Sequence, residues 1–449
     1  MNLERYLQYA LLALGVLCSF VLVIVFRDFY HHEDLNVFWK WANSWPDHWR
    51  NIYISCKWCN YPVIGVFSSA GLLRILGNGD YQNAVFFFRM VLGFVDGVNI
   101  LLLFWLLKKL DIDNAAMWAG IVGLLPSSWV GGALWGQIDS ISQFFILIAF
   151  AWIVHNNLRE QSDKKNVAIY LAVSGVMLSW IVLSKQTTIF GLFSIGCLLF
   201  TSLVFTSKKW TQFALKSLFA AAFFILPIAF WDVFLILKKP YFSHLYYIWK
   251  TGSNHGDIIS GNGFNIWMFL GRDMLSSSHV PLFFASSANP EVFSFFTPYW
   301  IGLFLFLLFN SALAFFLFLF LWKRFSNHKR FMDRDVLLNF LFHFSLVNLS
   351  FNIFLTGTHE RYLYHFYPFI ILAVLGLKKY TKPFSNYTVY ILLFGAGLYG
   401  SFILYLLSGI GRSHGYTYHW GVGLFHFGLL CLLSITYFRY VTRPAILDV

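Results

Sequence analysis

The chain has 449 residues, of which 58% are hydrophobic and 21% aromatic, while only 12% are charged. A soluble globular domain carries roughly twice that charged fraction, so the composition excludes a soluble protein and indicates a polytopic membrane protein. A net charge of +12 would suggest a nucleic-acid partner in a soluble chain. In a membrane protein, basic residues in short loops set the orientation instead, and we expect no nucleic acid.

About 12 apolar runs follow one another along the chain and predict membrane-spanning helices. They lie near 7–26, 87–107, 115–134, 141–155, 167–184, 187–206, 213–236, 299–322, 336–356, 362–377, 387–408 and 418–438. The predicted fold class is an all-α polytopic membrane protein with about 12 transmembrane helices, or roughly 11 to 13. These helices are expected to form one membrane-embedded domain over residues 1–449. The first run is too long for a signal-peptide core and is expected to be retained.

The basic residues predict the orientation. About 18 of the 32 Lys and Arg residues fall at the termini or in short loops that alternate connections place on one side, and such a side is cytoplasmic. Both termini are therefore expected in the cytoplasm, and the long connections 27–86 and 237–298 outside. Counting the run 61–77 as a span would put Lys108 and Lys109 outside, so this run is expected to lie along the outer surface.

The cysteines give little support to a metal site. Three of the five fall in apolar runs and are expected to be packing residues. Cys56 and Cys59 form a C-x-x-C pattern in a polar stretch, but no second pair completes a zinc site. A local disulfide or two free thiols are both better explanations than a metal or redox role.

Five polar clusters interrupt the apolar pattern, and all of them fall on the predicted outer side. They are His31-His32-Glu33-Asp34, Trp135-Gly136-Gln137-Ile138-Asp139, Ser184-Lys185-Gln186-Thr187, Gly261-Asn262-Gly263-Phe264-Asn265 within the loop 251–272, and Thr358-His359-Glu360-Arg361-Tyr362. Ionisable groups near membrane depth are costly and usually functional. Their common side suggests one outward-facing site, to which loops 27–86 and 237–298 contribute.

Each cluster also has a plain structural explanation. Lys185 could simply extend its ammonium to the headgroups, and Glu360 with Arg361 could form a local ion pair. His31 and His32 resemble a solvated pair and receive no role. Asp96 lies seven residues after Arg89 on one helical face, where a buried structural ion pair is at least as good an explanation as a catalytic one.

The residue types together match a sugar transfer from a lipid phosphate. The catalytic candidates are Asp34, Glu33 and Asp139, with Asp34 or Glu33 as the base. The donor-binding candidates, which would hold the phosphate by charge-assisted hydrogen bonds, are Lys185, Gln186, His359, Arg361 and Tyr362. The candidates for sugar or acceptor binding are Trp135, Gln137, Asn262 and Asn265. Nucleotide sugars are not normally available on the outer side, so an activated sugar there would arrive on a lipid phosphate.

These motifs carry a family resemblance. The pattern Asp34-x-x-x-Phe38-x-x-Trp41-Ala42, then Asn60-Tyr61-Pro62, then Trp135-Gly136-Gln137-x-Asp139, resembles the GT-C membrane glycosyltransferases. Lys185-Gln186, Asn262-Gly263-Phe264-Asn265-x-Trp267 and His359-Glu360-Arg361-Tyr362 follow in the same order. The most similar branch is the bacterial relatives of the mannosyltransferase that adds the second mannose to GPI anchors. The motifs run from about residue 34 to 368, and the departure is Val63, where relatives often show a second proline.

The resemblance implies a polyprenyl- or dolichyl-phosphate-linked hexose donor, mannose or glucose, and an inverting single displacement with a base from the acidic first outer loop. The expected function is therefore a glycosyltransferase that acts on the periplasmic or lumenal side in cell-envelope polysaccharide or glycolipid assembly. The acceptor would be a glycan, a glycolipid or a protein. No cofactor is required, although the sequence leaves a divalent metal open. The outer loops lack N-x-S/T sites with a permitted middle residue, which favours a bacterial inner membrane over an ER membrane.

A transporter or flippase of lipid-linked sugars is the main alternative. It would place polar residues at mid-span depth and show an internal repeat that relates two halves. The sequence shows no such repeat, and its ionisable clusters lie at the ends of spans. A non-catalytic membrane scaffold is a third possibility, but it would not need five polar clusters on one side.

Overall fold

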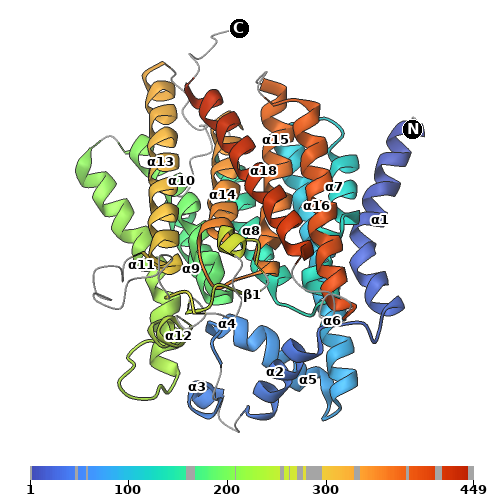
Figure 1. The fold of residues 1–449 in the computed structure, drawn as a ribbon. Helices are drawn as coiled ribbons and strands as arrows, with labels where there is room; N and C mark the ends of the chain where they lie inside the picture. Colours follow the sequence, from blue (N-terminus) through green and yellow to red (C-terminus); the bar gives the residue numbers. More distant parts are fainter. Residues whose placement is uncertain are drawn as a thin grey trace, which may run out of the picture. The chain divides into compact units, whose positions relative to one another are not determined.

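The computed structural model describes residues 3–45, 49–56, 59–157, 167–207, 209–252, 257–261, 263–270, 277–279, 296–327, 334–380, 384–409 and 417–442. Helices dominate these residues (Figure 1), and the two short strands among them, β1 (Ser260–Gly261) and β2 (Thr358–His359), pair in parallel. The expectation of an all-α membrane protein is confirmed at this level. The chain divides into two compact units, unit 1 (Met1–Thr251 and Met332–Arg334) and unit 2 (Gly252–Phe331 and Asp335–Val449). The single domain over 1–449 stays a prediction.

Unit 1 is built from long apolar helices joined by short amphipathic ones. In chain order its α-helices are α1 (Leu3–Val25), α2 (His32–Asn43), α3 (Ile52–Ser55), α4 (Val63–Val66), α5 (Leu72–Gly77), α6 (Tyr81–Lys109), α7 (Ala115–Leu124), α8 (Asp139–Asn157), α9 (Val167–Ser184), α10 (Ile189–Thr206), α11 (Trp210–Phe234) and α12 (His244–Gly252). The short helices α2 to α5 gather at the end of this unit away from its N-terminus (Figure 1).

Unit 2 holds the remaining helices and both strands. Besides β1 and β2, its elements are η8 (Ile266–Leu270), α13 (Pro298–Asn327), α14 (Arg334–Phe354), η9 (Glu360–His365), α15 (Phe366–Tyr380), α16 (Asn386–Leu407) and α18 (Thr417–Thr442). The most hydrophobic stretch of α14 is completely buried inside the protein. α14 nevertheless carries Asn339, His343 and Asn348 among its buried residues.

Nine helices of the described ranges are long and apolar enough to cross a membrane, and they indicate a multi-pass membrane protein. They are α1, α6, α8, α9, α11, α13, α14, α16 and α18. The predicted run 115–134 falls short because α7 ends at Leu124, directly before Leu125 and Pro126, and a proline disfavours a helical residue in front of it. α15 has only 15 residues, fewer than the roughly 20 that a transmembrane helix needs. The count of about 12 spans therefore stays a prediction.

The run 61–77 forms a short helical segment over Val63–Gly77, with a π-helical turn at Phe67–Gly71. At 1.5 Å per residue it is about 22 Å long, which is less than the roughly 30 Å hydrocarbon thickness of a bilayer. The chain leaves it through Asn78 and Gly79, which have φ values of 44° and 86°. Asp80 then caps α6 by accepting from the N–H groups of Gln82 and Asn83. Its length agrees with its exclusion from the spans, and its position at the outer surface stays a prediction.

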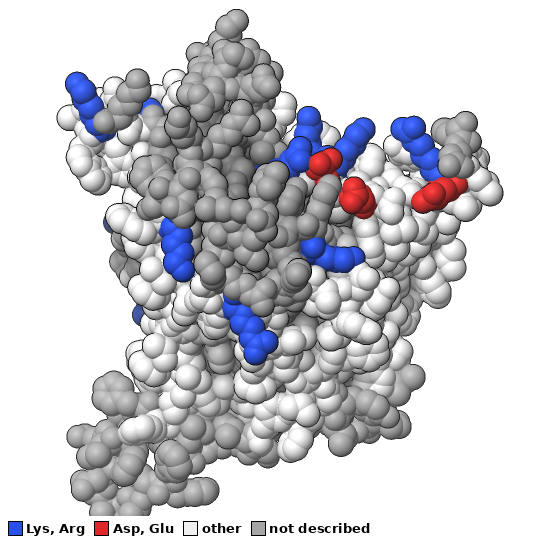
Figure 2. Space-filling view, turned by 90° about the horizontal axis from the view of Figure 1, so that it is seen from above, with Lys and Arg blue, Asp and Glu red and all other residues white. Residues whose placement is uncertain are grey.

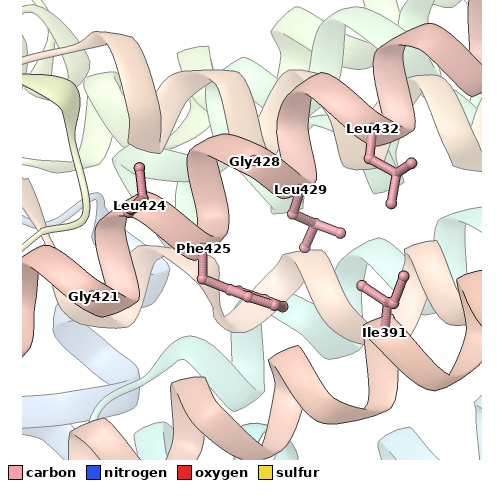
Figure 3. A pocket seen from close by; sticks show the side chains of 7 residues that line it. All are labelled: Ile391, Gly421, Leu424, Phe425, Gly428, Leu429 and Leu432. Atoms are coloured by element: carbon pink, nitrogen blue, oxygen red, sulfur yellow. The ribbon is translucent and has the colours of Figure 1, made fainter.

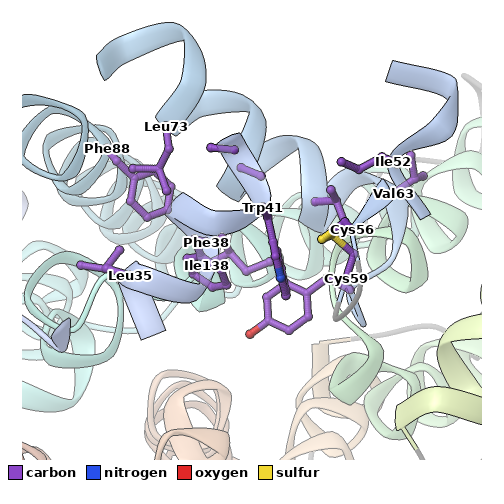
Figure 4. Packing of buried hydrophobic residues seen from close by; sticks show 14 of the residues in the cluster. Leu35, Phe38, Trp41, Ile52, Cys56, Cys59, Val63, Leu73, Phe88 and Ile138 are labelled. Carbon is purple, nitrogen blue, oxygen red and sulfur yellow. A yellow bond between two sulfur atoms is a disulfide. The ribbon is translucent and has the colours of Figure 1, made fainter. Parts of the chain in front are cut away.

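The short helices of unit 1 share a hydrophobic core. α2 is amphipathic and buries Leu35, Phe38, Trp41 and Ala42, which recur at helical spacing on one face. This face packs against residues of α3, α5 and α6 and against Ile138 (Figure 4). Cys56 and Cys59 join the same core as a disulfide, with Cα atoms 5.6 Å apart. The C-x-x-C pattern is therefore the first of the two predicted alternatives, a local disulfide.

Arg89 of α6 ties α1 to α2. Its side chain is fully buried and donates to the carbonyls of Phe26, Arg27 and Phe29, which follow α1, at 3.1, 2.6 and 3.0 Å. A fourth bond reaches the carbonyl of Ala133 at 3.0 Å. These three carbonyls belong to the turn between α1 and α2, so Arg89 holds this turn in place. This supports a structural role for Arg89.

Figure 2 shows the charged side chains on one face of the described residues. On the face drawn in Figure 2, Lys and Arg side chains are more prominent than Asp and Glu side chains. A basic face is typical of the cytoplasmic side of a membrane protein. The side of the membrane on which this face lies stays a prediction.

Candidate functional site

The carboxylate of Asp34 is held at the start of α2. Glu33 and Asp34 occupy the first turn of this helix, where the positive end of the helix dipole favours negative charge. One oxygen of Asp34, Oδ2, accepts from Trp135 Nε1 at 2.7 Å and from Gln137 Nε2 at 2.6 Å. The side chain keeps 25% of its surface exposed. Asp34 is thus both fixed in orientation and reachable.

A second layer of tyrosines fixes Gln137. Tyr61 donates its hydroxyl to Gln137 Oε1 at 2.9 Å, and Tyr53 donates to the Tyr61 carbonyl at 2.8 Å. With its oxygen engaged by a hydroxyl donor, the amide of Gln137 must present its NH₂ group to Asp34. Burial, with smaller contributions from Tyr247 and Asp232, raises the pKa of Tyr53 well above its ordinary value, so this hydroxyl remains a donor. Tyr61 comes shortly after the Cys56–Cys59 disulfide.

The turn that carries Trp135 and Gln137 depends on Gly136. Its φ of 90° lies in the left-handed region, which glycine enters without the penalty that a side chain brings. A Cβ at this position would also lie 2.8 Å from a methyl carbon of Leu35. The sequence Trp-Gly-Gln therefore lets α2 pack directly on the turn and aims both flanking side chains at Asp34.

Asp139 and Lys185 form a separate ion pair in unit 1. Lys185 Nζ lies 2.6 Å from Asp139 Oδ1, and the two side chains are 2% and 1% exposed. The ammonium also lies 5.9 Å from the centre of the Tyr61 ring. Lys185 therefore points into the protein interior, and Gln186 follows it half-buried at the start of a 3-10 turn. Because both charges are buried, the removal of either one would destabilise the protein.

In unit 2 the pairing of β1 with β2 joins two distant motifs. Ser260 is the partner of Thr358, and Gly261 is the partner of His359. Asn265 is buried and donates to the carbonyls of Ile259 and Leu355 at 2.8 and 3.2 Å. The Asn265 side chain thus holds together the two backbone segments that pair as β1 and β2. Asn262 lies outside the described residues.

Two glycines allow this crossing. A Cβ on Gly261 would lie 2.5 Å from the His359 ring, and a Cβ on Gly263 would lie 2.3 Å from the Thr358 hydroxyl and 2.4 Å from its carbonyl oxygen. Real Cβ atoms do not approach that closely. The spacing Gly261-x-Gly263 therefore reflects close packing of the first motif on the second.

Arg361 follows β2 in the 3-10 helix η9 and is largely buried. Its Nη1 donates to Glu360 Oε1 at 3.1 Å, and the two side chains are 12% and 2% exposed. The guanidinium lies 5.9 Å from the centre of the Tyr362 ring, and His359 meets the same ring edge-on at 5.3 Å. The local ion pair considered for Glu360 and Arg361 is present, with a His, an Arg and a Tyr side by side.

The sequence interpretation missed two residues of unit 1. Tyr61 lay within a recognised motif but received no role, although it fixes Gln137. His31 received no role either, yet it caps α2 and stacks on Trp135 with ring centres 4.3 Å apart. Its position three residues before Asp34 at the start of an amphipathic helix is the spacing of a helix cap, and this signal could have revealed it. His32, by contrast, is exposed.

A metal site and an apolar groove were the other candidates for a functional site. No group of three or more His, Cys, Asp or Glu side chains that could hold a metal ion occurs within the described ranges. A groove of about 390 Å³ between α16 and α18 is lined by apolar residues such as Leu424, Phe425 and Leu429, together with two glycines (Figure 3). Such a lining has no side chain that could recognise a sugar hydroxyl.

No protein-family model, curated protein or solved structure matches the chain. The resemblance to the GT-C glycosyltransferases therefore rests on the motifs alone. Two polar clusters of the described residues are the candidates for a chemical role. They are the Asp34 cluster of unit 1 (His31, Asp34, Tyr61, Trp135 and Gln137) and the Arg361 cluster of unit 2 (His359, Glu360, Arg361 and Tyr362).

Proposed function

We propose that the protein is a membrane glycosyltransferase that transfers a hexose, mannose or glucose, from a polyprenyl-phosphate donor to an acceptor hydroxyl. The observation that carries this proposal is the state of Asp34. Its carboxylate is partly exposed, yet two neutral N–H donors hold one of its oxygens in place. A general base needs both properties, access to the proton and a fixed geometry.

In the proposed reaction Asp34 takes the proton of the acceptor hydroxyl while that oxygen attacks the anomeric carbon. The bond from the anomeric carbon to the phosphate oxygen breaks, the polyprenyl phosphate departs with the electron pair, and the configuration inverts. Asp139 is a weaker candidate for the base because it is buried and already paired with Lys185. Glu33, which is exposed in the same turn, is the remaining alternative.

Arg361 is the candidate for the donor phosphate. A guanidinium can contact two phosphate oxygens at once, and the charge that develops on the leaving phosphate is what such a contact stabilises. His359 and Tyr362 flank it. Lys185 and Gln186 were predicted for the same task, but the Lys185 side chain is only 2% exposed in its pair with Asp139. Arg361 is also paired, with Glu360, but keeps 12% of its side chain exposed, so the phosphate contact is assigned first to Arg361.

The proposal includes a place in the cell. The protein would lie in a bacterial inner membrane, with both termini in the cytoplasm and the Asp34 cluster on the periplasmic side. The acceptor would be a glycan, glycolipid or protein of cell-envelope assembly. The reaction as written requires no cofactor.

A second candidate function is transport of lipid-linked sugars, and one observation favours it. Polar side chains are buried within candidate spans, namely Asp96 and Asn99 on α6 and Asn339, His343 and Asn348 on α14. Ionisable and polar groups at such positions often line a path through a membrane protein. Flipping of a lipid-linked sugar in protein-containing vesicles, without release of polyprenyl phosphate, would support this candidate.

The direct test uses purified protein in nanodiscs with a synthetic polyprenyl phosphate that carries a radiolabelled hexose. Membrane lipid and glycan extracts serve as acceptors. We expect label to move to the acceptor and free polyprenyl phosphate to appear in equal amount. Asp34→Asn should slow transfer by ~10²–10⁴-fold, while Glu33→Gln should stay close to wild type. Transfer that survives Asp34→Asn but not Glu33→Gln would move the base to Glu33, and survival of both variants would remove the outer-loop carboxylate from the chemistry.

A further inference from the structure

One ring nitrogen of His31 lies close to two atoms of Asp34, the proposed base. Its Nδ1 accepts a hydrogen bond from the backbone N–H of Asp34 at 3.2 Å, which caps α2. The same Nδ1 lies 3.6 Å from Asp34 Oδ2. The ring stacks on Trp135 at an interplanar angle of 11°, and only 17% of the side chain is exposed. His31 is therefore held against both Asp34 and the indole that donates to Asp34.

The cap defines the charge of this histidine. A ring nitrogen can accept a hydrogen bond only when it carries no proton. The cap on Asp34 N–H therefore requires the neutral imidazole with its proton on Nε2. A protonated ring would carry a hydrogen on Nδ1 as well, would lose the cap, and would turn that hydrogen toward Asp34 Oδ2. Protonation thus exchanges a helix cap for an ion pair with the base.

The exchange would weaken Asp34 as a base. A positive charge beside a carboxylate stabilises its ionised form and lowers its tendency to take a proton. Oδ2 would then be shared among Trp135, Gln137 and the imidazolium. Only the neutral form of His31 leaves the hydrogen bonds from Trp135 and Gln137 to the Asp34 carboxylate unchanged.

The surrounding charges oppose one another. Glu33 and Asp34, in the first turn of α2, favour the protonated ring. The positive end of the α2 dipole opposes it, and so does Arg89 of α6, whose guanidinium lies 5.3 Å from the centre of the neighbouring Tyr30 ring. Trp135 and Gln137 bring no charge. Imidazole groups change charge between about pH 5 and 8, so both forms are accessible in that range.

We propose that His31 is a positioning residue for Asp34, and that its neutral form is required for the base to act. The inference rests on the proposed function. It has a specific consequence: the loss of transfer rate on the acid side of the optimum follows the protonation of His31 and not that of the Asp34 carboxyl.

The test compares pH–rate profiles of wild type, His31→Asn and His32→Asn. Asn can cap a helix but does not titrate, so His31→Asn should move the acid limb down by about two pH units, the usual gap between imidazole and carboxyl groups. Its plateau should fall a few-fold because the stack on Trp135 is lost. His32→Asn, which changes an exposed neighbour, should keep the wild-type profile. An unchanged acid limb in His31→Asn would overturn the proposal, and His31→Ser, another cap former, replaces it if the Asn variant does not fold.

A second measurement does not depend on transferase activity. NMR of ring-labelled histidine, with the His31 signal assigned by difference against the His31 variant, reports the tautomer and the titration. We expect the proton on Nε2 at high pH and a lower titration midpoint in Asp34→Asn, which lacks the carboxylate charge. A proton on Nδ1, or a midpoint that Asp34→Asn leaves unchanged, would overturn the coupling. If the coupling is present but no lipid-linked hexose is transferred, the proposed function fails and the His31–Asp34 exchange stands.

Discussion

The Asp34 cluster of unit 1 and the Arg361 cluster of unit 2 use polar groups in opposite ways. Around Asp34, side chains from distant segments donate to one partly exposed carboxylate, so the polar groups serve a reactive atom. In the Arg361 cluster the guanidinium is paired with the buried Glu360, and the neighbouring Asn265 donates to two backbone carbonyls. Unit 1 thus holds a partly exposed carboxylate in a fixed orientation, whereas unit 2 holds a largely buried Arg361 beside Glu360.

The largest effect is expected from the buried ion pair of unit 1. Lys185→Ala removes the ammonium that balances the buried Asp139 carboxylate, and should lower the free energy of unfolding by about 3–5 kcal/mol. The double variant Lys185→Met, Asp139→Leu should recover most of that loss. Thermal unfolding in detergent measures both, with the exposed Lys108→Ala as control. A Lys185→Ala protein as stable as the control would show that the pair does not support the fold.

The second-largest effect is expected from Arg361, the residue proposed to bind the donor phosphate. Arg361→Ala should weaken binding of a non-hydrolysable polyprenyl phosphonate by about 1.5–3 kcal/mol, the range for a charged hydrogen bond. Arg361→Lys should also weaken it, because the planar fork is lost. Binding titrations in nanodiscs test this, with the exposed Arg5→Lys as the matched control. Unchanged affinity in both Arg361 variants would show that the guanidinium does not bind the donor phosphate.

The glycine spacing of unit 2 gives a third prediction. In Gly263→Ala the new Cβ would collide with Thr358, and such overpacking typically costs about 1–3 kcal/mol of stability. Gly421→Ala on α18 is the matched control, since a Cβ there meets nothing within 4 Å. Differential scanning of both variants decides the point. Equal unfolding temperatures would contradict the close crossing of β1 and β2.

The smallest effect is expected from Tyr61. Tyr61→Phe removes one hydroxyl donor to Gln137, a loss worth about 0.5–1.5 kcal/mol, and should slow transfer by up to about tenfold because the Gln137 amide is free to rotate. Tyr247→Phe is a suitable control in the same unit. A transfer rate equal to wild type would show that the Tyr61 hydroxyl is not needed to orient Gln137.

The sequence predicted the helical fold because the apolar runs are long and distinct, and each predicted run contains helical residues. The expected span over 115–134 ignored Pro126, which is visible in the sequence and ends α7 at Leu124. Among the site residues, the sequence placed Asp34, Trp135 and Gln137 in one site. It could not predict the hydrogen bonds between them, because Asp34 lies about a hundred positions from the other two. It assigned Lys185 and Asp139 to different roles for the same reason, because only the packing of α8 against α9 brings them into contact.

The measurement that tests the central claim most directly uses azide as an acceptor that carries no proton. If Asp34 acts only as a base, Asp34→Ala should lose transfer to hydroxyl acceptors by ~10²–10⁴-fold yet form glycosyl azide from the polyprenyl-phosphate hexose as fast as wild type does, with inverted configuration. The same preparation serves both assays, so the folded fraction is identical. Loss of both reactions in Asp34→Ala, while the protein still binds the phosphonate analogue, would contradict the account and leave Asp34 with a structural role.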